Sequence, residues 1–391
     1  MLDVAALTGE INRILIVRPS ALGDVCRTVP VLVSLRRAFP GAQIDWVVRD
    51  TFTAAVEAHP ALDRVIAFPR MRFSRFWRDS AVTRELWRWL WMLRRQRYDL
   101  VIDCQGLSRS ALISLAAGAP QRIGPGRARE FGWLAYTRRV SRDTPMHTVD
   151  EMLALLSAID VEPVRDMQLY VEADAKRWWT DKRRTFGATA EHYAVLAPTA
   201  RWISKRWPAD RWRELIENLQ ARGFDHVVVI GAPDEAEQVE AALPGDRTGI
   251  VNLAGQTSIA QTMAVIADAS LLVAHDSAPL HIAAGFDRPC IGLYGPTDPN
   301  VVGPLGSRAI VVGGGPSAAT NGGRAVRYRD PNLGDTIMRT ITVEAVLDAV
   351  DRACGGDALN GDAGTDTRNG CSVKEQMPAE ATASDTLHQT G

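Results

Sequence analysis

The chain has 391 residues, of which 46% are hydrophobic and 23% are charged, and its formal net charge is −1. This length exceeds what one hydrophobic core usually serves, so we expect two domains. A net charge near zero argues against a general nucleic-acid-binding protein, which normally carries a basic excess. The five cysteines, at positions 26, 104, 290, 354 and 371, show neither CxxC nor Cys/His spacing, which indicates free thiols in a reducing cytoplasm.

Three further stretches of the sequence bear on location and order. The opening MLDVAALTGEINR lacks a basic stretch followed by an apolar core, so we expect no signal peptide. No apolar run reaches the length needed to cross a bilayer, which predicts a soluble protein with at most peripheral membrane contact. Residues 355–391 are polar and rich in Gly, Ala, Thr and Asp, and this composition predicts a disordered tail.

Strand-like apolar runs alternate with helix-like segments along most of the chain. In the first half, strands are expected over 14–17, 44–48, 65–68 and 100–103, with a helix over about 24–38 and a long Arg- and Trp-rich helical region before the fourth strand. In the second half, strands are expected over 194–197, 227–230, 271–274 and 290–294, with helices over 209–222, 234–243, 258–267 and 279–284. This alternation predicts an α/β protein with two doubly wound, Rossmann-like domains, over 11–172 and 173–353.

The run RPSALGD, from Arg18 to Asp24, lies between a predicted strand and a predicted helix. Ligands of open α/β sheets bind at such strand ends. Gly23 allows a tight turn, and Asp24 would lie near the helix N-terminus, where the helix dipole favours an ionised carboxylate. That carboxylate could accept a proton from a sugar hydroxyl, although a helix cap is an equally good interpretation of the pattern.

The run from Leu271 to His281 again has the pattern of strand, polar turn and helix. Pro279 suits the first helical turn, so the neighbouring amides would point outward and form an anion site that a diphosphate fits. These amides belong to Ser277, Ala278 and Leu280. Asp276 would orient the turn and His281 could reach a phosphate or sugar oxygen, whereas His275 is expected to be structural. A routine Asp-Ser helix start is the alternative.

Two further strand-to-helix loops carry candidate residues. Lys205, between Pro198 and Pro208, could neutralise charge on a leaving phosphate, a role that metals fill in other enzymes. The chain contains no DxD triplet of the kind that clamps a metal-diphosphate, although Lys205 could also be a solvated loop lysine. Glu235, in the loop GAPDE, could accept hydrogen bonds from ribose hydroxyls or simply be a first-turn acid.

The segment from Arg64 to Arg97 is strongly basic and aromatic. It holds ten arginines against two acids, Asp79 and Glu85. It also holds four of the eleven tryptophans, at positions 77, 87, 89 and 91. Arginine and tryptophan together suit an anionic, amphipathic surface such as phospholipid head groups or a charged glycolipid. The alternative is an amphipathic helix whose tryptophans pack on the sheet.

These motifs, in this order, resemble those of glycosyltransferase family 9, the ADP-heptose:lipopolysaccharide heptosyltransferases. The similarity runs from about Ile14 to Leu305, and its most specific parts are RPSALGD, VIDCQGLSRSAL, KRWPADRWRELI, GAPDEAE and RPCIGLYGPTDP. The resemblance implies a GT-B fold, in which two Rossmann-like domains face each other across a cleft and bind the acceptor and the ADP-sugar respectively. It also implies an inverting, metal-independent transfer of heptose to a lipopolysaccharide inner-core acceptor of the Kdo-lipid A type, with no cofactor besides the ADP-sugar.

The resemblance also implies roles for individual residues. By matching position, Asp24 is the base that deprotonates the acceptor hydroxyl, and Lys205 acts on the sugar and phosphate side of the donor. The implied donor site comprises Thr199, Ala200, Lys205, Glu235, Thr257, Asp276, Ser277, Ala278, Leu280 and His281. The implied acceptor site comprises Arg18, Ser20, Arg70, Arg72, Arg75, Gln105 and Arg129. Ala278 and Thr257 replace a glycine and a methionine that relatives carry.

Other functions stay open at this stage. The same fold supports sugar-nucleotide epimerases and hydrolases, and a non-catalytic protein that binds a nucleotide-sugar or an anionic glycolipid is a further alternative. A nicotinamide dehydrogenase is disfavoured because the chain lacks GxGxxG in a strand-turn-helix context. The expected partners are ADP-heptose and an anionic glycolipid acceptor, with no nucleic acid. We expect a cytoplasmic monomer in peripheral contact with the inner membrane.

Overall fold

The structure is a computed structural model, and it describes residues 10–141, 146–187, 192–313, 320–321, 324–325 and 337–355. The predicted disordered tail, apart from Gly355, lies outside these residues. Every helix within the described ranges is too short or too polar to span a bilayer.

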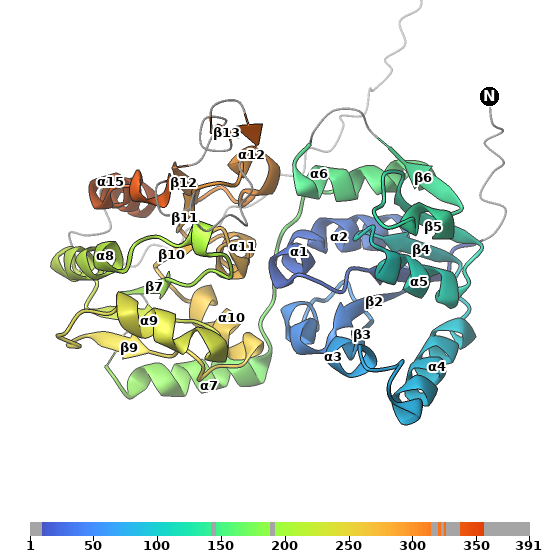
Figure 1. Ribbon diagram of the computed structural model, residues 1–391, viewed down its shortest axis with the longest axis horizontal. Coiled ribbons are helices and arrows are strands. Elements are labelled where there is room, and N and C mark those ends of the chain that lie inside the picture. Colours follow the sequence, from blue (N-terminus) through green and yellow to red (C-terminus); the bar gives the residue numbers. More distant parts are fainter. Residues whose placement is uncertain are drawn as a thin grey trace, which may run out of the picture. The chain divides into compact units, whose positions relative to one another are not determined.

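The first half of the chain forms a six-stranded sheet in the order β3-β2-β1-β4-β5-β6 (Figure 1). Its strands are β1 (Arg13–Val17), β2 (Gln43–Arg49), β3 (Arg64–Phe68), β4 (Leu100–Asp103), β5 (Gln121–Pro125) and β6 (Arg138–Val140). All of them run parallel, and Ile14 of β1 is in register with Ile44 and with Leu100. The central strands are continuous apolar runs because helices cover both faces of the sheet.

Alternate residues of β1 show which helices cover which face. Ile14 and Ile16 belong to the core beneath α1 (Leu22–Arg27), α2 (Val29–Ala38), α6 (Thr148–Leu153) and η3 (Ala154–Ile159). Leu15 and Val17 belong to the core beneath α3 (Arg70–Phe73), α4 (Ser80–Arg95) and α5 (Ser108–Ala117). Two 3-10 helices, η1 (Asp50–Ala55) and η2 (Gly132–Ala135), lie in the connections.

The second half forms another parallel six-stranded sheet, in the order β12-β11-β10-β7-β8-β9. Its strands are β7 (Tyr193–Ala197), β8 (His226–Val229), β9 (Ile250–Asn252), β10 (Leu271–His275), β11 (Cys290–Tyr294) and β12 (Ala309–Gly313). One face packs against α7 (Ala173–Arg184), α10 (Ile259–Ala267) and α11 (Ala278–Gly285), and the other against α8 (Ala209–Ala221), α9 (Ala236–Ala242) and α15 (Val343–Cys354). Short elements are η4 (Ile203–Lys205), η5 (Pro233–Glu235), α12 (Pro299–Val302), β13 (Thr320–Asn321) and β14 (Arg324–Ala325).

Counted within its own half, each sheet has the strand order 3-2-1-4-5-6. In such a sheet the chain reverses direction between the first and fourth strands, and this switch point forms a crevice at the carboxyl ends of the strands. The two crevices lie between β1 and β4 and between β7 and β10. The prediction of an α/β protein with two doubly wound halves is therefore confirmed, whereas the boundary at residue 172 stays a prediction.

The two halves touch through α1 and α11. Side chains of the first half also reach the carbonyls around α12: Thr148 Oγ1 donates to Val301 at 2.9 Å, and Arg27 Nη1 donates to Val302 at 3.3 Å. One hydrophobic core runs continuously from residues of the first sheet to residues of the second. These contacts between the two halves fix the loops at the two switch points relative to each other.

Two predicted helices are each divided in the structure. The helix expected over 24–38 is α1 and α2, because Pro30 has no backbone N–H to continue the hydrogen-bond ladder and Thr28 Oγ1 bonds the Asp24 carbonyl at 2.8 Å. The helix expected over 234–243 starts as η5 and continues as α9. The strands β5, β6, β9 and β12 were not expected, and three of them are short or polar.

Candidate active site

The first switch point is organised by Asp103, the last residue of β4. Its carboxylate is fully buried and accepts the backbone amides of Gln105 at 2.8 Å and Gly106 at 3.1 Å, and the Tyr136 hydroxyl at 2.8 Å. The resulting turn brings Gln105 beside the loop that follows β1, where the Ser20 amide donates to Gln105 Oε1 at 3.3 Å. Two predicted acceptor residues therefore meet across the switch point.

Asp24, the third residue of α1, lies between two arginines. Arg18 Nη2 is 3.0 Å from Asp24 Oδ2, and Arg27 forms an ion pair with Asp24 Oδ1. The Ala21 amide donates to Asp24 Oδ2 at 3.2 Å, so the predicted capping contact is also present. Burial raises the pKa of Asp24, but Arg18, Arg27 and the Ala21 amide outweigh it and hold the pKa below its ordinary value. Asp24 is therefore ionised near neutral pH.

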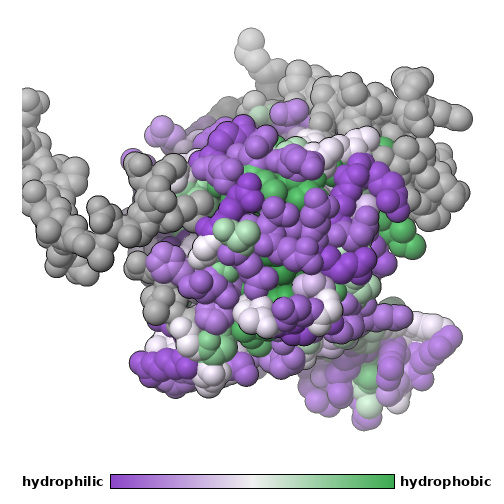
Figure 2. Space-filling model, turned by 90° about the vertical axis from the view of Figure 1, so that its left-hand side faces the viewer, coloured by the Kyte–Doolittle hydropathy of each residue, from purple (hydrophilic) through white to green (hydrophobic). Residues whose placement is uncertain are grey.

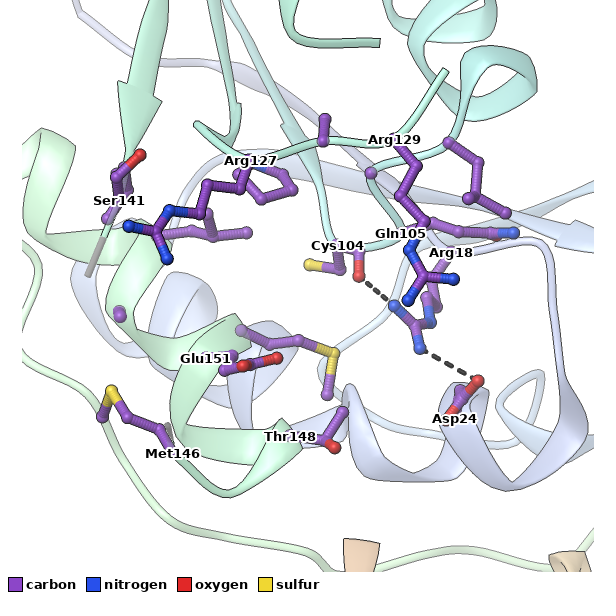
Figure 3. Close-up of a pocket in the computed structure, with 18 of the residues that line it drawn as sticks. Arg18, Asp24, Cys104, Gln105, Arg127, Arg129, Ser141, Met146, Thr148 and Glu151 are labelled. Carbon is purple, nitrogen blue, oxygen red and sulfur yellow. Dashed lines mark hydrogen bonds and ion pairs between the residues drawn. The ribbon is translucent and has the colours of Figure 1, made fainter. Parts of the chain in front are cut away.

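A cavity of about 900 Å³ opens beside Asp24 (Figure 3). Four of the predicted acceptor residues line it: Arg18, Ser20, Gln105 and Arg129. Arg18 spans from the Cys104 carbonyl, which accepts its Nη1, to the Asp24 carboxylate, as the dashed lines in Figure 3 show. The cavity is large enough for a sugar-sized ligand. Its wall carries arginine side chains beside the ionised carboxylate of Asp24.

The other three predicted acceptor residues do not line this cavity. Arg72 Nε pairs with Glu85 at 2.5 Å, and its side chain is 62% exposed. Arg75 is exposed as well. Arg70 begins α3, and burial together with the positive charges of Arg109, Arg49 and Arg201 lowers its pKa. Arg49, Arg109 and Arg201 therefore lie near Arg70. None of these four arginines lines the cavity beside Asp24.

The second switch point has an ion pair at its centre. Lys205 Nζ lies 2.6 Å from Asp276 Oδ2, and only 15% and 10% of these side chains are exposed. The Thr297 hydroxyl donates to the same Asp276 oxygen at 2.9 Å. Burial raises the pKa of Asp276, but Lys205, His281 and the Thr297 hydroxyl together outweigh this effect and the pKa is lowered. A charged Lys205 is thus fixed at the start of the predicted diphosphate turn.

Two buried polar atoms at the start of α11 have no hydrogen-bond partner among the described residues. They are Ser277 Oγ and His281 Nδ1. Buried polar groups are almost always hydrogen-bonded, so atoms of this kind indicate a place where a ligand binds. Together with the first amides of α11, they make an anion site next to Lys205.

The predicted roles around this turn need one correction. The Leu280 amide donates to the Ser277 carbonyl at 3.2 Å, so the prediction that it points outward is wrong. The Leu280 side chain is fully buried. The prediction that His275 is structural is confirmed, because its Nε2 accepts the Trp207 amide at 2.8 Å and its Nδ1 contacts the Thr199 carbonyl at 3.2 Å.

Two residues of the predicted ribose side of the donor site, Thr199 and Glu235, are in contact. Thr199 Oγ1 donates to Glu235 Oε2 at 2.7 Å, and the Ala232 amide donates to the same oxygen at 2.9 Å. These bonds hold Glu235 while its carboxylate keeps acceptor capacity for further donors. Ala200 is buried, and its carbonyl accepts Arg206 Nε. The Thr257 hydroxyl bonds the Thr262 hydroxyl at 2.9 Å.

The two switch points meet at Gly23. A β-carbon placed on Gly23 would lie 2.8 Å from His281 Cδ2 and 3.4 Å from Ala278 Cα. Asp24 follows Gly23 directly, so the ionised carboxylate lies beside the turn that carries the unpartnered Ser277 and His281 atoms. An acceptor in the cavity and an anion on α11 would therefore adjoin one another at Asp24.

Sequence reasoning missed several residues of this site. Arg27 is buried and pairs with Asp24, and only its three-residue spacing on one helix could have indicated this contact. Arg127, Thr148 and Glu151 line the cavity from segments that carried no recognised motif. No cluster of three or more His, Cys, Asp or Glu side chains with metal-binding geometry occurs among the residues that the structure covers.

Residues 86–326 match the profile of glycosyltransferase family 9 (heptosyltransferase). Lipopolysaccharide heptosyltransferase 1 of Escherichia coli K12 is 32% identical over 303 residues, which cover 76% of this chain and 92% of that protein.

Two solved structures of E. coli heptosyltransferase WaaC are also similar. The one with ADP has 28% identity and a TM-score of 0.70, and the one with ADP-2-deoxy-2-fluoro heptose has 28% identity and a TM-score of 0.68. Each match covers 87% of this chain and 99% of the solved chain.

Proposed function

The chain belongs to glycosyltransferase family 9 (heptosyltransferase), and from this premise we propose that it transfers heptose from ADP-heptose to a lipopolysaccharide inner-core acceptor of the Kdo-lipid A type. The observation that carries the proposal is the contact of Gly23 with Ala278 and His281, which brings the Asp24 carboxylate beside the predicted diphosphate turn. WaaC, a relative of similar fold, has been solved with ADP and with an ADP-heptose analogue. This supports an ADP-sugar donor here.

The proposed reaction is a single displacement with inversion. The acceptor oxygen attacks the anomeric carbon, the bond from that carbon to the diphosphate oxygen breaks, and the proton of the hydroxyl passes to Asp24. Because Arg18 and Arg27 lower the pKa of Asp24, it is a weak base towards a free hydroxyl. Proton transfer therefore follows the attack, when the attacking oxygen has become strongly acidic.

Charge that develops on the leaving diphosphate needs stabilisation, and we propose that Lys205 and the start of α11 provide it without a metal ion. Lys205 is a buried cation, and the Ser277 and His281 atoms are available acceptor or donor partners. In a partly dry site such fixed charges act more strongly than in water. Lys205 then exchanges part of its interaction with Asp276 for one with the diphosphate.

The acceptor is proposed to be an anionic glycolipid that binds in the cavity beside Asp24. Arg18 and Arg129 form a cationic wall there, and the arginines around Arg70 lie outside it. A carboxylate-bearing sugar suits such a wall because guanidinium groups bind carboxylates in bidentate geometry. We further propose that the enzyme works as a monomer on the cytoplasmic side of the inner membrane.

The test is a product assay with three arms. ADP-heptose is incubated with the enzyme and a Kdo-lipid A acceptor, with the enzyme alone, and with the Asp24→Asn variant plus acceptor. Mass spectrometry should detect the heptosylated acceptor in the first arm only. Asp24→Asn should bind ADP nearly as well as the wild type but lose about a thousandfold or more in turnover. Rapid consumption of ADP-heptose without acceptor would instead favour a hydrolase or an epimerase.

Nucleotide preference is tested separately by thermal shift. ADP-, UDP- and GDP-sugars are compared at equal concentration, because a ligand that binds only the folded state raises the melting temperature. Selective stabilisation by the ADP-sugar supports the proposal. A preference for the UDP-sugar would overturn the donor assignment.

A further inference from the structure

Exposed apolar side chains are concentrated on one part of the first half. The described structure exposes eleven large apolar side chains, and nine of them lie between Met71 and Leu134. Six of the nine define what we call the outer surface: Trp87 and Trp91 on α4, Leu112 and Leu115 on α5, and Phe131 and Leu134 at η2. Their exposed fractions range from 49% to 75%. Figure 2, which faces the second half of the chain, shows mainly hydrophilic residues there.

The three elements of the outer surface adjoin one another. The helix α4 packs on α5, and α5 packs on η2. The Arg94 guanidinium covers Gly118, the residue that ends α5, so the two helices are also joined at their C-terminal ends. On α5 the exposed residues Leu112 and Leu115 are three apart and therefore share one face.

The exposed face of α4 alternates aromatic and basic residues. Positions 84, 87, 88, 91 and 95 are exposed, and they read Arg, Trp, Arg, Trp and Arg. The Arg95 guanidinium lies 4.3 Å above the Trp91 ring. In contrast, Trp89 is turned inward, where its indole N–H donates to the Ala67 carbonyl at 2.9 Å. Packing in the core therefore explains the presence of Trp89, but it does not explain the exposed Trp87 and Trp91.

The charge of this region is strongly positive. Residues 64–97 carry a net charge of +8, whereas the whole chain carries −1. Both acids of the segment are engaged: the Asp79 carboxylate accepts the Ala81 amide at 2.8 Å, and Glu85 pairs with Arg72. The helix α5 contains no acid and adds Arg109 to the exposed face. The surface is thus complementary to anions.

The outer surface begins where the Asp24 cavity ends. Gln105, Gly106 and Leu107 line that cavity and lead directly into α5. Ala128 and Arg129 line it as well and lead to Phe131. Whatever binds the outer surface is therefore next to the cavity beside Asp24.

We propose that the outer surface docks on the anionic phospholipid face of a bilayer, with its tryptophans and leucines in the interfacial layer and its arginines on the head groups. Tryptophan and arginine are the residues that suit this layer, since each has an apolar body and a polar or charged end. A second copy of the chain would bring two strongly basic surfaces together. The proposal deepens the proposed function and rests on it in one respect, which is that the acceptor is embedded in a lipid surface.

Vesicle binding tests the docking without any catalysis. The full-length protein is sedimented with phosphatidylcholine vesicles that contain or lack phosphatidylglycerol, and quenching of tryptophan fluorescence by brominated lipid is recorded. We expect binding and quenching on the anionic vesicles, weaker binding in high salt, and little binding to phosphatidylcholine alone. Equal binding to both vesicle types, or no binding to either, would overturn the proposal.

Variants locate the binding surface. Arg84→Gln/Arg88→Gln should lower the partition onto anionic vesicles about thirtyfold, since an arginine near such a surface contributes roughly fivefold. Leu112→Ser/Leu115→Ser should lower it about tenfold or more. The matched charge control is Arg177→Gln/Arg184→Gln on α7. Both of these arginines are exposed as well, and their substitution should leave the partition unchanged. If both arginine pairs lower the partition equally, binding is a net-charge effect and the proposal fails.

Two further measurements separate docking from catalysis and from self-association. Transfer to a deacylated, water-soluble acceptor should be equal for the wild type and the outer-surface variants, whereas transfer to a vesicle-embedded acceptor should fall with the partition. If neither acceptor is used by any protein, the proposed function fails while vesicle binding still reports on docking. If light scattering shows a dimer that Leu112→Ser/Leu115→Ser abolishes, and no vesicle binding occurs, the surface is a protein interface and the proposal is wrong.

Discussion

Gly23 and His281 lie so close that a β-carbon on Gly23 would come within 2.8 Å of His281 Cδ2. Gly23 belongs to α1 and His281 to α11, and His281 is only 3% exposed, so neither side can give way easily. Gly23→Ala should therefore push the two loops apart and cost about 1–3 kcal/mol of unfolding free energy, as overpacking usually does. Turnover should fall as well, because Asp24 is the next residue.

The matched control for this substitution is Gly41→Ala. A β-carbon at Gly41 would meet nothing within 4 Å, so the variant should be within about 0.5 kcal/mol of the wild type. Urea denaturation of both variants, with ADP release as the activity readout, gives the comparison. Equal stability of the two variants would show that the Gly23 contact is not tight.

Arg27 is expected to set the pH range in which Asp24 works. Arg18, Arg27 and the Ala21 amide hold the pKa of Asp24 below its ordinary value, so the base stays ionised throughout the usual assay range. Arg27→Gln removes one of these charges, so the pKa of Asp24 rises and the acid limb of kcat/KM moves to higher pH. Activity at neutral pH should fall about tenfold because the carboxylate loses a contact that orients it.

The control is Arg177→Gln, an exposed arginine far along the chain, which should leave the pH profile unchanged. Profiles of kcat/KM from pH 3 to 8 are measured for the wild type and for both variants. An unchanged acid limb in Arg27→Gln would mean that Arg27 does not act through the Asp24 carboxylate.

The ion pair of Lys205 and Asp276, whose side chains are 15% and 10% exposed, predicts a strong coupling. Lys205→Met leaves the Asp276 carboxylate buried without its cation, which should cost on the order of 3 kcal/mol of unfolding free energy. The double variant Lys205→Met/Asp276→Asn removes the unpaired charge and should recover most of that loss. Both variants should bind ADP much more weakly, because Lys205 is gone in each. A double variant that is no more stable than Lys205→Met would contradict the coupling.

Much of the fold could be predicted because the central strands are buried on both faces. Runs such as Ile14–Val17 and Ala194–Ala197 are continuously apolar and therefore stand out in the sequence. The edge strands do not, since β6 reads RRV and β9 reads IVN and neither has a fully buried residue. The break at Thr28 was also missed, although Pro30 could have indicated it.

The site was predicted where its residues follow directly from a strand. Asp24, Gln105, Lys205 and Asp276 all lie in the segments that follow β1, β4, β7 and β10 at the two switch points, and the family motifs cover these segments. Arg27 and Glu151 could not be found in this way, because their contribution depends on how α1 and α6 pack. Helix-dipole stabilisation of Asp24 was expected, but α1 has only six residues and the two arginines supply the charge instead.

Glu235 should recognise the ribose of the nucleotide by accepting hydrogen bonds from the ribose hydroxyls. Its Oε2 accepts two protein donors, Thr199 Oγ1 and the Ala232 amide, which leaves capacity for a ligand hydroxyl. The wild type should bind ADP about tenfold more tightly than the 2′,3′-dideoxy analogue, and Glu235→Gln should narrow this difference to about twofold or less. Calorimetric titration of both nucleotides checks this. If Glu235→Gln leaves the ratio of the two nucleotide affinities unchanged, the ribose does not bind at Glu235.

His281 should make the protein sensitive to acid. Burial, together with the positive charge of Arg27, lowers the pKa of His281 to about 3, whereas an unfolded histidine titrates near 6.5. Between these values the unfolded state binds the proton and the folded state does not, so the free energy of unfolding falls as the pH drops from 6.5 towards 3. His281→Gln removes this proton uptake, so the free energy of unfolding of the variant should depend less on pH, by up to about 1.4 kcal/mol per pH unit in that range. Urea titrations at pH 7.5, 6.0 and 5.0 measure the two slopes. Parallel slopes for the variant and the wild type would mean that His281 accepts the proton in the folded state as well.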